Sequence, residues 1–356
     1  MQDKPLGRTG CRVGAIGLGC AGLGDDGPGA PESAAEVAAL QLGIDLGMTL
    51  IDTAEVYANG CSEELVGLAI QGRRERVCIA TKVATDHLAY ADVLAAAEGS
   101  LRRLETDIID LYQVHWPNPK VPLADTMRAV ERLLRDGKVR YIGLSNFSMK
   151  ELRNAQAALS SERIVSLQAE YNLSDRTVEH VLPYCVQEGL SLIAYSPLDK
   201  GRIVSSRSKL DALAAIAEQY GKTPAQIALQ WLISREPVLA IPKAATLQHV
   251  RDNAAAADIV LDEADVKEID RLCTQPCVCV PTDRIRVVTH SSHPAYRTAE
   301  EARENRLGLA PSPSELAQAL RSGEMLKPVR VVPTSDASGA FDYDLTEGRV
   351  RYWAWV

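Results

Sequence analysis

The sequence predicts an α/β protein: a (β/α)8 TIM barrel that begins with a β-hairpin and is followed by a small α+β module. Short apolar runs rich in β-branched residues alternate with amphipathic helical patterns over residues 1–275, as expected for strands buried on both faces. Eight such runs favour a closed barrel over an open sheet. The 356 residues are enough for one barrel and a smaller second domain over 276–356.

The elements of the barrel follow one another in order. A hairpin that turns at Thr9 and Gly10 precedes the first strand. The predicted strands span residues 15–19, 49–53, 77–82, 108–115, 139–145, 164–168, 190–196 and 238–242. The clearest helices between them span 62–72, 123–138 and 223–235, with start signals at Ser62 and at Thr223 followed by Pro224. A helix over 261–273 should complete the barrel.

Composition narrows the class of protein. The chain is 46% hydrophobic and 24% charged, as is ordinary for a globular protein. It has no apolar run long enough to span a bilayer and no signal-peptide pattern at its N-terminus, so we expect a cytoplasmic protein without membrane contacts. The net charge of −8 argues against nucleic acid as a partner.

Eight cysteines are scattered along the chain, and in a cytoplasmic protein they should be reduced thiols. Potential metal ligands gather only at Cys273, Cys277, Cys279, His290 and His293. The spacings of "CVC" and "HSSH" fit zinc ligand pairs poorly, so we expect no metal.

Four polar residues fall at or just beyond the carboxyl ends of successive predicted strands, where barrels carry their active sites. Asp52 ends the second strand, Lys82 the third and His115 the fourth, and Tyr57 follows Asp52 in the next loop. Each residue alone could have a structural role. Together they suit proton donation to an oxygen while hydride is delivered to carbon. A lysine ammonium favours the phenolate and should make the tyrosine a better acid, the carboxylate can hold the lysine, and the histidine can orient a carbonyl.

Seven segments carry a resemblance to a known family: "IDTAEVYANGCSEELVG", "ATK", "DLYQVHWP", "VRYIGLSNF", "QAEYN", "AYSPL" and "IPKAATLQHVRDN". In order and spacing they resemble the aldo-keto reductase superfamily over about residues 4–273. The resemblance implies NADPH-dependent reduction of an aldehyde or ketone. Tyr57 would be the general acid, Lys82 and Asp52 would tune it, and His115 would position the carbonyl. It also implies a nicotinamide cofactor bound without a Rossmann domain, and "GLGCAGLG" (17–24) lacks the helix start of a dinucleotide fingerprint.

The same resemblance implies a set of cofactor contacts. The carboxamide of the nicotinamide would be held by Ser145, Asn146 and Gln168, and the ring would stack on Tyr195. The pyrophosphate would run along Ser196 and Leu198, the 2′-phosphate of NADP would face Lys243, and the adenine would lie near Asp252 and Asn253.

Two segments depart from the family pattern. Ala244 and His249 stand where many NADP-preferring members have serine and arginine, so NADH remains an alternative to NADPH. The extended "GDDGPGAPES" (24–33) should border the substrate pocket and be mobile.

The remaining residues predict strands at 280–288, 327–334 and 341–345, and a helix at 313–325 that starts near Ser314 and ends at Gly323. A last helix should begin in "EGRVRYWAWV". This order and the motif formed by Gly348, Arg351, Tyr352 and Ala354 resemble the N-terminal, ParB/sulfiredoxin-type domain of ParB-like proteins. The resemblance implies nucleotide or phosphate binding by Gly348 and Arg351. We expect a truncated domain, which would leave the ligand set incomplete, and a packing or dimerisation role is the alternative.

Other functions stay open at this point. The chain could be an NADP-sensing regulatory protein whose tail binds a nucleotide or partner, or an enzyme that mainly oxidises alcohols. We expect a monomer or a homodimer, and the sequence leaves the identity of the carbonyl substrate open.

Overall fold

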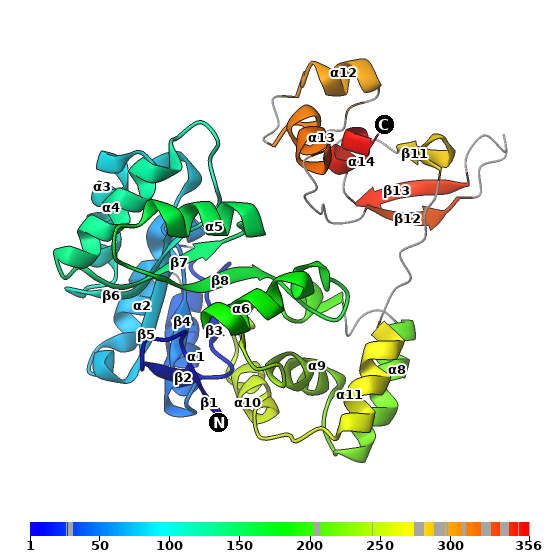
Figure 1. Cartoon of the computed structure of the whole chain (residues 1–356). Helices are drawn as coiled ribbons and strands as arrows, with labels where there is room; N and C mark the ends of the chain where they lie inside the picture. The colour runs from blue at the N-terminus through cyan, green and yellow to red at the C-terminus, as the bar shows by residue number, and fades with distance from the viewer. Residues whose placement is uncertain are drawn as a thin grey trace. The chain divides into compact units, whose positions relative to one another are not determined.

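The structure is a computed structural model that describes residues 1–25, 27, 31–202, 207–243, 245–273, 281–287, 296, 298–307, 311–321, 329–334, 342–347 and 349–355. Contacts divide the chain into two compact units, Met1–Thr274 and Gln275–Val356, which Figure 1 colours from blue to yellow and from yellow to red. Among the described residues, no helix combines the length and the apolar character needed to cross a membrane.

Eight parallel strands of the first unit pair in chain order and form the barrel. They are β3 (Leu18–Gly19), β4 (Leu50–Asp52), β5 (Cys78–Val83), β6 (Ile109–Val114), β7 (Val139–Ser145), β8 (Ile164–Glu170), β9 (Ser191–Tyr195) and β10 (Val238–Ala240). The first and last strands meet through short bridges, because the backbone N–H of Gly17 donates to Ala240 and that of Ala240 donates to Ala15. The predicted (β/α)8 barrel is confirmed, and every strand overlaps its predicted segment, with β5 and β8 running one and two residues further.

Helices surround the strands (Figure 1). They are α1 (Pro31–Asp45), α2 (Cys61–Ile70), α3 (Tyr90–Arg103), α4 (Leu123–Arg135), α5 (Met149–Ala158), α6 (Leu182–Glu188), α8 (Arg207–Gln219), α9 (Pro224–Ile233), α10 (Leu247–Ala256) and α11 (Glu263–Cys273). Thr223 caps α9 as predicted, in a reciprocal capping box with Gln226. The predicted cap at Ser62 is wrong: Gly60 precedes α2, and the buried Ser62 hydroxyl instead donates to the carbonyl of Cys20.

A hairpin covers the barrel at the amino ends of the strands. Its strands β1 (Asp3–Pro5) and β2 (Arg12–Gly14) are antiparallel, as predicted. Leu6 and Val13 from the hairpin join one buried cluster with the barrel interior. The buried ammonium of Lys4 donates to the carbonyls of Ile233, Arg235 and Val238 at 2.5, 2.7 and 2.9 Å. The hairpin is therefore fastened to the barrel by apolar contact and by hydrogen bonds.

The second unit has a three-stranded sheet and three short helices among its described residues. The strands lie in the order β11 (Ile285–Val287), β13 (Tyr343–Glu347), β12 (Arg330–Pro333), with β11 parallel and β12 antiparallel to β13. The helices are α12 (Ala299–Arg303), α13 (Pro313–Arg321) and α14 (Arg349–Trp355). All three strands and both helices expected in this region are present, and only β13 runs past its predicted segment, by two residues.

Tyr352 on α14 is the centre of the small core of this unit. It packs with Ile285 and Leu345, and its hydroxyl donates to the carbonyl of Thr282. The start of α13 differs from the prediction, because the hydroxyl of Ser312 accepts from the backbone of Glu315, so Ser312 rather than Ser314 caps the helix. Gly323, the predicted helix end, lies outside the described residues.

Candidate active site

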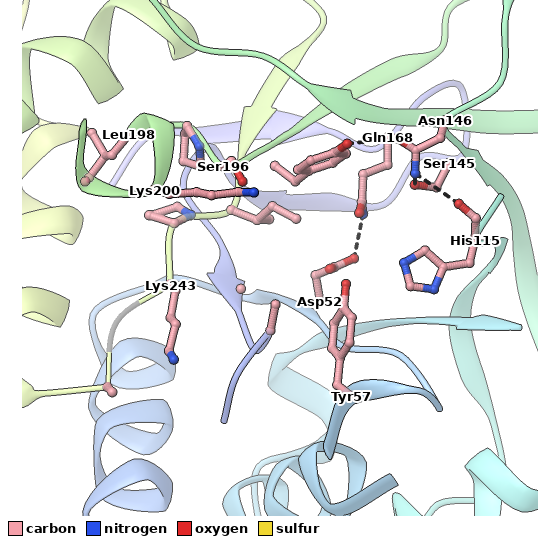
Figure 2. Close-up of a pocket in the computed structure, with 18 of the residues that line it drawn as sticks. Asp52, Tyr57, His115, Ser145, Asn146, Gln168, Ser196, Leu198, Lys200 and Lys243 are labelled. Carbon is pink, nitrogen blue, oxygen red and sulfur yellow. Dashed lines mark hydrogen bonds between the residues drawn. The ribbon is translucent and has the colours of Figure 1, made fainter. Parts of the chain in front are cut away.

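A pocket of about 710 Å³ opens at the carboxyl ends of the barrel strands. This volume suits a cofactor or a small molecule. Among the residues predicted for the site, the pocket wall includes Asp52, Tyr57, His115, Ser145, Asn146, Gln168, Tyr195, Ser196, Leu198 and Lys243. In Figure 2 the labelled side chains of this set converge on one space. Polar residues at the ends of successive strands were predicted to lie together at one rim of the barrel, and the structure places them there.

The buried ammonium of Lys82 lies behind the pocket wall and bonds to two of the residues that line it. Lys82 lies near the end of β5 with its side chain fully buried. Its Nζ donates to Asp52 Oδ1 at 2.6 Å, to the Thr53 carbonyl at 2.8 Å and to the Tyr57 hydroxyl at 3.2 Å. Burial alone would lower the pKa of Lys82, but Asp52 and Tyr57 outweigh burial and raise that pKa. Lys82 therefore stays charged throughout the neutral range.

Two glutamine side chains hold the other oxygen of Asp52. Gln168 Nε2 donates to Asp52 Oδ2 at 2.6 Å, and Gln113 Nε2 donates to the same oxygen at 3.2 Å. Figure 2 shows the Gln168 bond. Both oxygens of the Asp52 carboxylate therefore accept hydrogen bonds, which hold the group in one orientation. The sequence interpretation missed Gln113, which reads as an ordinary strand residue two positions before His115.

Tyr57 projects from a short helical turn, Tyr57–Gly60, whose backbone is strained. Ala58 and Asn59 have φ of 49° and 53°, in the left-handed region that few side chains favour. Burial raises the pKa of Tyr57, and the Lys82 charge opposes this shift without reversing it. Lys82 therefore acts on Tyr57 in the expected direction, but the sequence did not reveal the larger, opposing effect of burial on the pKa.

His115 follows β6 and meets Tyr57 edge to face, with ring centroids 5.7 Å apart and an interplanar angle of 80°. Burial, with the neighbouring Lys82 charge, lowers the pKa of His115 to about 4. The imidazole is therefore neutral at pH 7 and able to donate or accept a hydrogen bond in the pocket. Trp116, the next residue, also lines the pocket and is 48% exposed.

A buried ion pair braces the turn that carries Tyr57. Glu63, fully buried on α2, accepts hydrogen bonds from Thr81 Oγ1 at 2.5 Å and from Arg103 Nε at 2.7 Å. Thr81 directly precedes Lys82 in β5, and Arg103 packs against Gly60 at the end of the Tyr57 turn. Gly60 has a φ of 96°, and a Cβ there would lie 2.6 Å from Arg103 Cδ. The brace thus ties the turn that carries Tyr57 to β5, the strand that carries Lys82.

One side of the pocket is lined by amides and hydroxyls. Asn146 Nδ2 donates to the Ser145 hydroxyl and to the His115 carbonyl, at 3.0 and 3.1 Å. The Tyr195 hydroxyl donates to Asn146 Oδ1 at 2.9 Å. Asn146 has a positive φ of 63°, which asparagine tolerates better than most residues. Ser145, Asn146 and Tyr195 therefore form one connected polar group, whereas the side-chain amide of Gln168 bonds to Asp52.

The other end of the pocket carries lysines. Lys243 and Lys200 lie at the opposite end of the pocket from His115 (Figure 2). Lys243 Nζ donates to the carbonyl of Gly22 at 2.7 Å. Lys200, which the sequence interpretation missed, follows "SPLD" and has a φ of 53°. His249 also lines this end. The pocket thus has an amide end and a cationic end.

Asp252 and Asn253, expected near an adenine, lie further along α10 and are not part of the pocket wall. Asn253 is buried, and Asp252 Oδ1 accepts from Gln248. Ala244 and several residues of the 24–33 loop lie outside the described part of the chain.

The predicted phosphate site of the tail is described only in part. Gly348 lies outside the described residues, whereas Arg351 is half-buried on α14. Cys277, Cys279, His290 and His293 also lie outside them, and within the described part no group of three histidine, cysteine or acidic side chains is placed to hold a metal ion. The ParB-like assignment stays a prediction.

The fold and the pocket define a TIM-barrel protein whose ligand site lies at the carboxyl ends of its strands. The chain belongs to the aldo/keto reductase family, whose model matches residues 15–273. Methylglyoxal reductase YeaE of Escherichia coli (strain K12) is 38% identical over 279 residues, covering 78% of this chain and 97% of that protein. Aldo-keto reductase YhdN of Bacillus subtilis (strain 168) is 33% identical over 276 residues, covering 66% and 82%.

Solved structures agree with this assignment. An aldo/keto reductase from Klebsiella pneumoniae in complex with NADP and acetate is 40% identical with a TM-score of 0.72, covering 78% of this chain and 98% of that one. The thermostable aldo-keto reductase Tm1743, in complex with the inhibitor epalrestat, is 43% identical with a TM-score of 0.72, covering 76% and 100%. The family match ends at residue 273.

Proposed function

We propose that this protein is an NADPH-dependent reductase of aldehydes or ketones in which Tyr57 gives the proton. The observation that carries the proposal is the buried Lys82 ammonium, which donates to both the Asp52 carboxylate and the Tyr57 hydroxyl at the pocket wall. A structural ion pair does not need a tyrosine hydroxyl directed into a pocket. This arrangement keeps the acid protonated and places a fixed positive charge beside the phenolate that proton donation leaves.

The pocket fits a nicotinamide dinucleotide phosphate. Its amide end offers Ser145, Asn146 and Gln168 for a carboxamide, and Tyr195 offers a flat ring for stacking. When bound, the nicotinamide supplies the hydride. The cationic end, with Lys200 and Lys243, suits the pyrophosphate and the 2′-phosphate. The solved relatives that hold NADP and NADPH support this choice of cofactor.

The proposed mechanism gives a separate task to each residue of a catalytic tetrad, which consists of Asp52, Tyr57, Lys82 and His115. The neutral imidazole of His115 donates a hydrogen bond to the carbonyl oxygen and so orients the substrate. Tyr57 transfers its hydroxyl proton to that oxygen as negative charge develops on it. Lys82 stabilises the resulting phenolate, and Asp52 keeps Lys82 in place and charged. Proton donation of this kind contributes about 100- to 10,000-fold to a rate.

The relatives suggest where to look for the substrate. The likeness to a methylglyoxal reductase makes small dicarbonyl aldehydes the first class to test. The half-exposed indole of Trp116 at the pocket wall adds an apolar surface for the rest of the substrate.

The test is Tyr57→Phe, followed by NADPH absorbance with methylglyoxal and a panel of other aldehydes and ketones. We expect kcat/KM to fall about 100-fold or more, with NADPH binding by fluorescence titration unchanged. Tyr184→Phe, on α6 and away from the pocket wall, is the matched control and should keep full turnover. Near wild-type turnover in Tyr57→Phe would remove Tyr57 from the mechanism. If the wild-type protein reduces none of these aldehydes and ketones, a binding or sensing role would be favoured.

A further inference from the structure

Tyr57 and His115 stand on different loops, although the proposed mechanism directs both at one carbonyl oxygen. Tyr57 lies on the loop after β4 (residues 53–60) and His115 on the loop after β6 (residues 115–122). Strand β5 pairs with both β4 and β6, so the loop after β5 (residues 84–89) lies between the two. We call these segments the β4, β5 and β6 loops. A displacement of about 1 Å between reacting groups can cost about 100-fold in rate, so whatever fixes the β5 loop bears on catalysis.

Glu55 on the β4 loop reaches across to the β5 loop. It lies two residues before Tyr57, and its side chain is only 9% exposed. Its Oε1 accepts from the backbone N–H of Ala84 at 2.6 Å and lies 3.1 Å from His87 Nδ1. Because Ala84 is buried, its N–H depends on this acceptor, and the carboxylate fixes the first residue of the β5 loop to the loop of Tyr57.

Asn118 on the β6 loop binds the same segment. Its Nδ2 donates to the carbonyl of Thr85 at 2.8 Å. His115, three residues earlier, donates from its backbone N–H to the carbonyl of Val83, the last residue of β5, at 3.2 Å. Thr85 directly follows Ala84 in the chain. The β4 and β6 loops are therefore held on adjacent residues of the β5 loop, through one carboxylate and one carboxamide.

Glu55 and Asn118 both lie outside the described pocket wall, so any effect on turnover must pass through residues that line it. The groups proposed to hold NADPH stand on later strands, with Ser145 at the end of β7, Gln168 on β8 and Tyr195 at the end of β9. A change in Glu55 should therefore reach the proton donor without disturbing the cofactor contacts.

We propose that Glu55 is a positioning residue that sets Tyr57 and His115 toward one carbonyl oxygen. It does so by holding the β5 loop, together with Asn118. The proposal rests on the reductase function proposed above. Without the carboxylate, the buried N–H of Ala84 loses its acceptor, which is unfavourable enough to make the loop open toward water. Tyr57 and His115 would then lie further from the geometry that proton donation needs, and the chemical step should slow.

The experiment compares Glu55→Ala with Glu55→Gln in the full-length protein. Reduction of methylglyoxal, or of whichever carbonyl the panel identifies, is followed in single turnovers of the NADPH-bound enzyme, because product release can hide a slower chemical step. Glu55→Ala should slow the single turnover about 10-fold, while the NADPH Kd by fluorescence titration stays within about twofold of wild type. The carboxamide oxygen of glutamine can still accept from Ala84, so Glu55→Gln should keep at least about half of the wild-type rate.

Glu131→Ala is the matched control for a loss of stability alone. Glu131 on α4 is 5% exposed and also accepts from loop N–H groups, those of Ser160 and Ser161, at 2.8 and 3.2 Å. These serines precede β8 and so lie at the amino end of the barrel strands, opposite the pocket. The urea midpoint of Glu131→Ala should fall at least as far as that of Glu55→Ala, while its single turnover keeps the wild-type rate.

Two further measurements test the loop contacts separately. Asn118→Ala removes the other link and should also slow the single turnover with an unchanged NADPH Kd, so it decides the question if Glu55→Ala does not fold. Amide hydrogen exchange of Ala84, followed by NMR, needs no turnover and should be faster in Glu55→Ala than in Glu55→Gln or wild type. Equal exchange in the three proteins would show that Glu55 does not hold the loop.

Three results would overturn the proposal and leave the reductase function intact: a wild-type rate in Glu55→Ala or Asn118→Ala, an equal loss of rate in Glu131→Ala, or a loss in Glu55→Gln as large as in Glu55→Ala. The last result would assign the effect to the charge beside His87 rather than to the bond with Ala84. A wild-type protein that reduces no carbonyl would overturn the reductase function itself, and the positioning role would fall with it.

Discussion

Replacing Lys82 by methionine should destabilise the protein more than replacing both Lys82 and Asp52. Lys82→Met removes the ammonium that holds Asp52 Oδ1 at 2.6 Å and leaves a carboxylate that is 2% exposed. The donors that remain on this carboxylate are the amides of Gln113 and Gln168, which carry no charge. Removing one partner of a buried ion pair costs about 3–5 kcal/mol, because the other charge is then buried without compensation.

The double variant Lys82→Met/Asp52→Asn leaves no buried charge. Replacing a whole buried pair by neutral groups of similar size is often nearly neutral, so we expect a loss of about 1–2 kcal/mol here. Asp52→Asn alone should cost about as much as Lys82→Met alone, since it leaves a buried ammonium. The double-mutant cycle should therefore give a coupling energy of about 4 kcal/mol or more.

The assay pairs urea unfolding, followed by circular dichroism, with NADPH consumption at saturating aldehyde. Turnover should stay at least about 100-fold down in both the single Lys82→Met variant and the double variant, because neither has the ammonium beside Tyr57. Lys267→Met breaks an exposed ion pair with Glu263 and is the control, with an expected cost within about 1 kcal/mol. Additive losses in the cycle would refute the charge pairing, and recovered turnover in the double variant would refute the role of the ammonium.

Two further predictions concern the pH dependence and the Tyr57 turn. Because His115 has its pKa near 4 and burial keeps Tyr57 protonated, kcat/KM for reduction should stay level from about pH 6 to 9 and fall only as Tyr57 ionises at higher pH. An acid-side fall with a midpoint near pH 6.5, measured in initial rates, would instead mean that His115 titrates normally. Gly60→Ala should lower turnover and cost about 1–3 kcal/mol, because its Cβ would overlap Arg103 and its φ is 96°. Gly72→Ala, also at positive φ but with open space around its Cβ, should cost about 1 kcal/mol and keep full turnover, so equal turnover in the two variants would argue against the brace.

The barrel could be predicted from the sequence because each strand is a short buried run with its own local signal. Buried parallel strands are apolar on both faces, and this pattern can be recognised in the sequence without knowing which strands lie beside each other. The position of the tetrad followed from the same signal, since the barrel rule places strand ends at one rim. Asp52, Lys82 and His115 could be grouped in this way although they are spread over 64 positions of the chain.

Contacts between distant residues gave no such signal. Gln113 differs from any other polar strand residue only through its bond to Asp52, which lies 61 positions away. Arg103 braces the Tyr57 turn through Glu63 across 40 positions. Such pairs depend on tertiary geometry that a local pattern does not contain.

The pKa of Tyr57 shows why a list of neighbours is not enough. The sequence places Lys82 near Tyr57, and that neighbour alone favours the phenolate. Burial acts in the opposite direction and prevails. These two effects together suit an acid catalyst. In the proposed mechanism, burial keeps the proton on Tyr57 until a carbonyl oxygen becomes more basic. The Lys82 bond at 3.2 Å then stabilises the phenolate, and its effect is strongest in the same water-poor surroundings that raised the pKa.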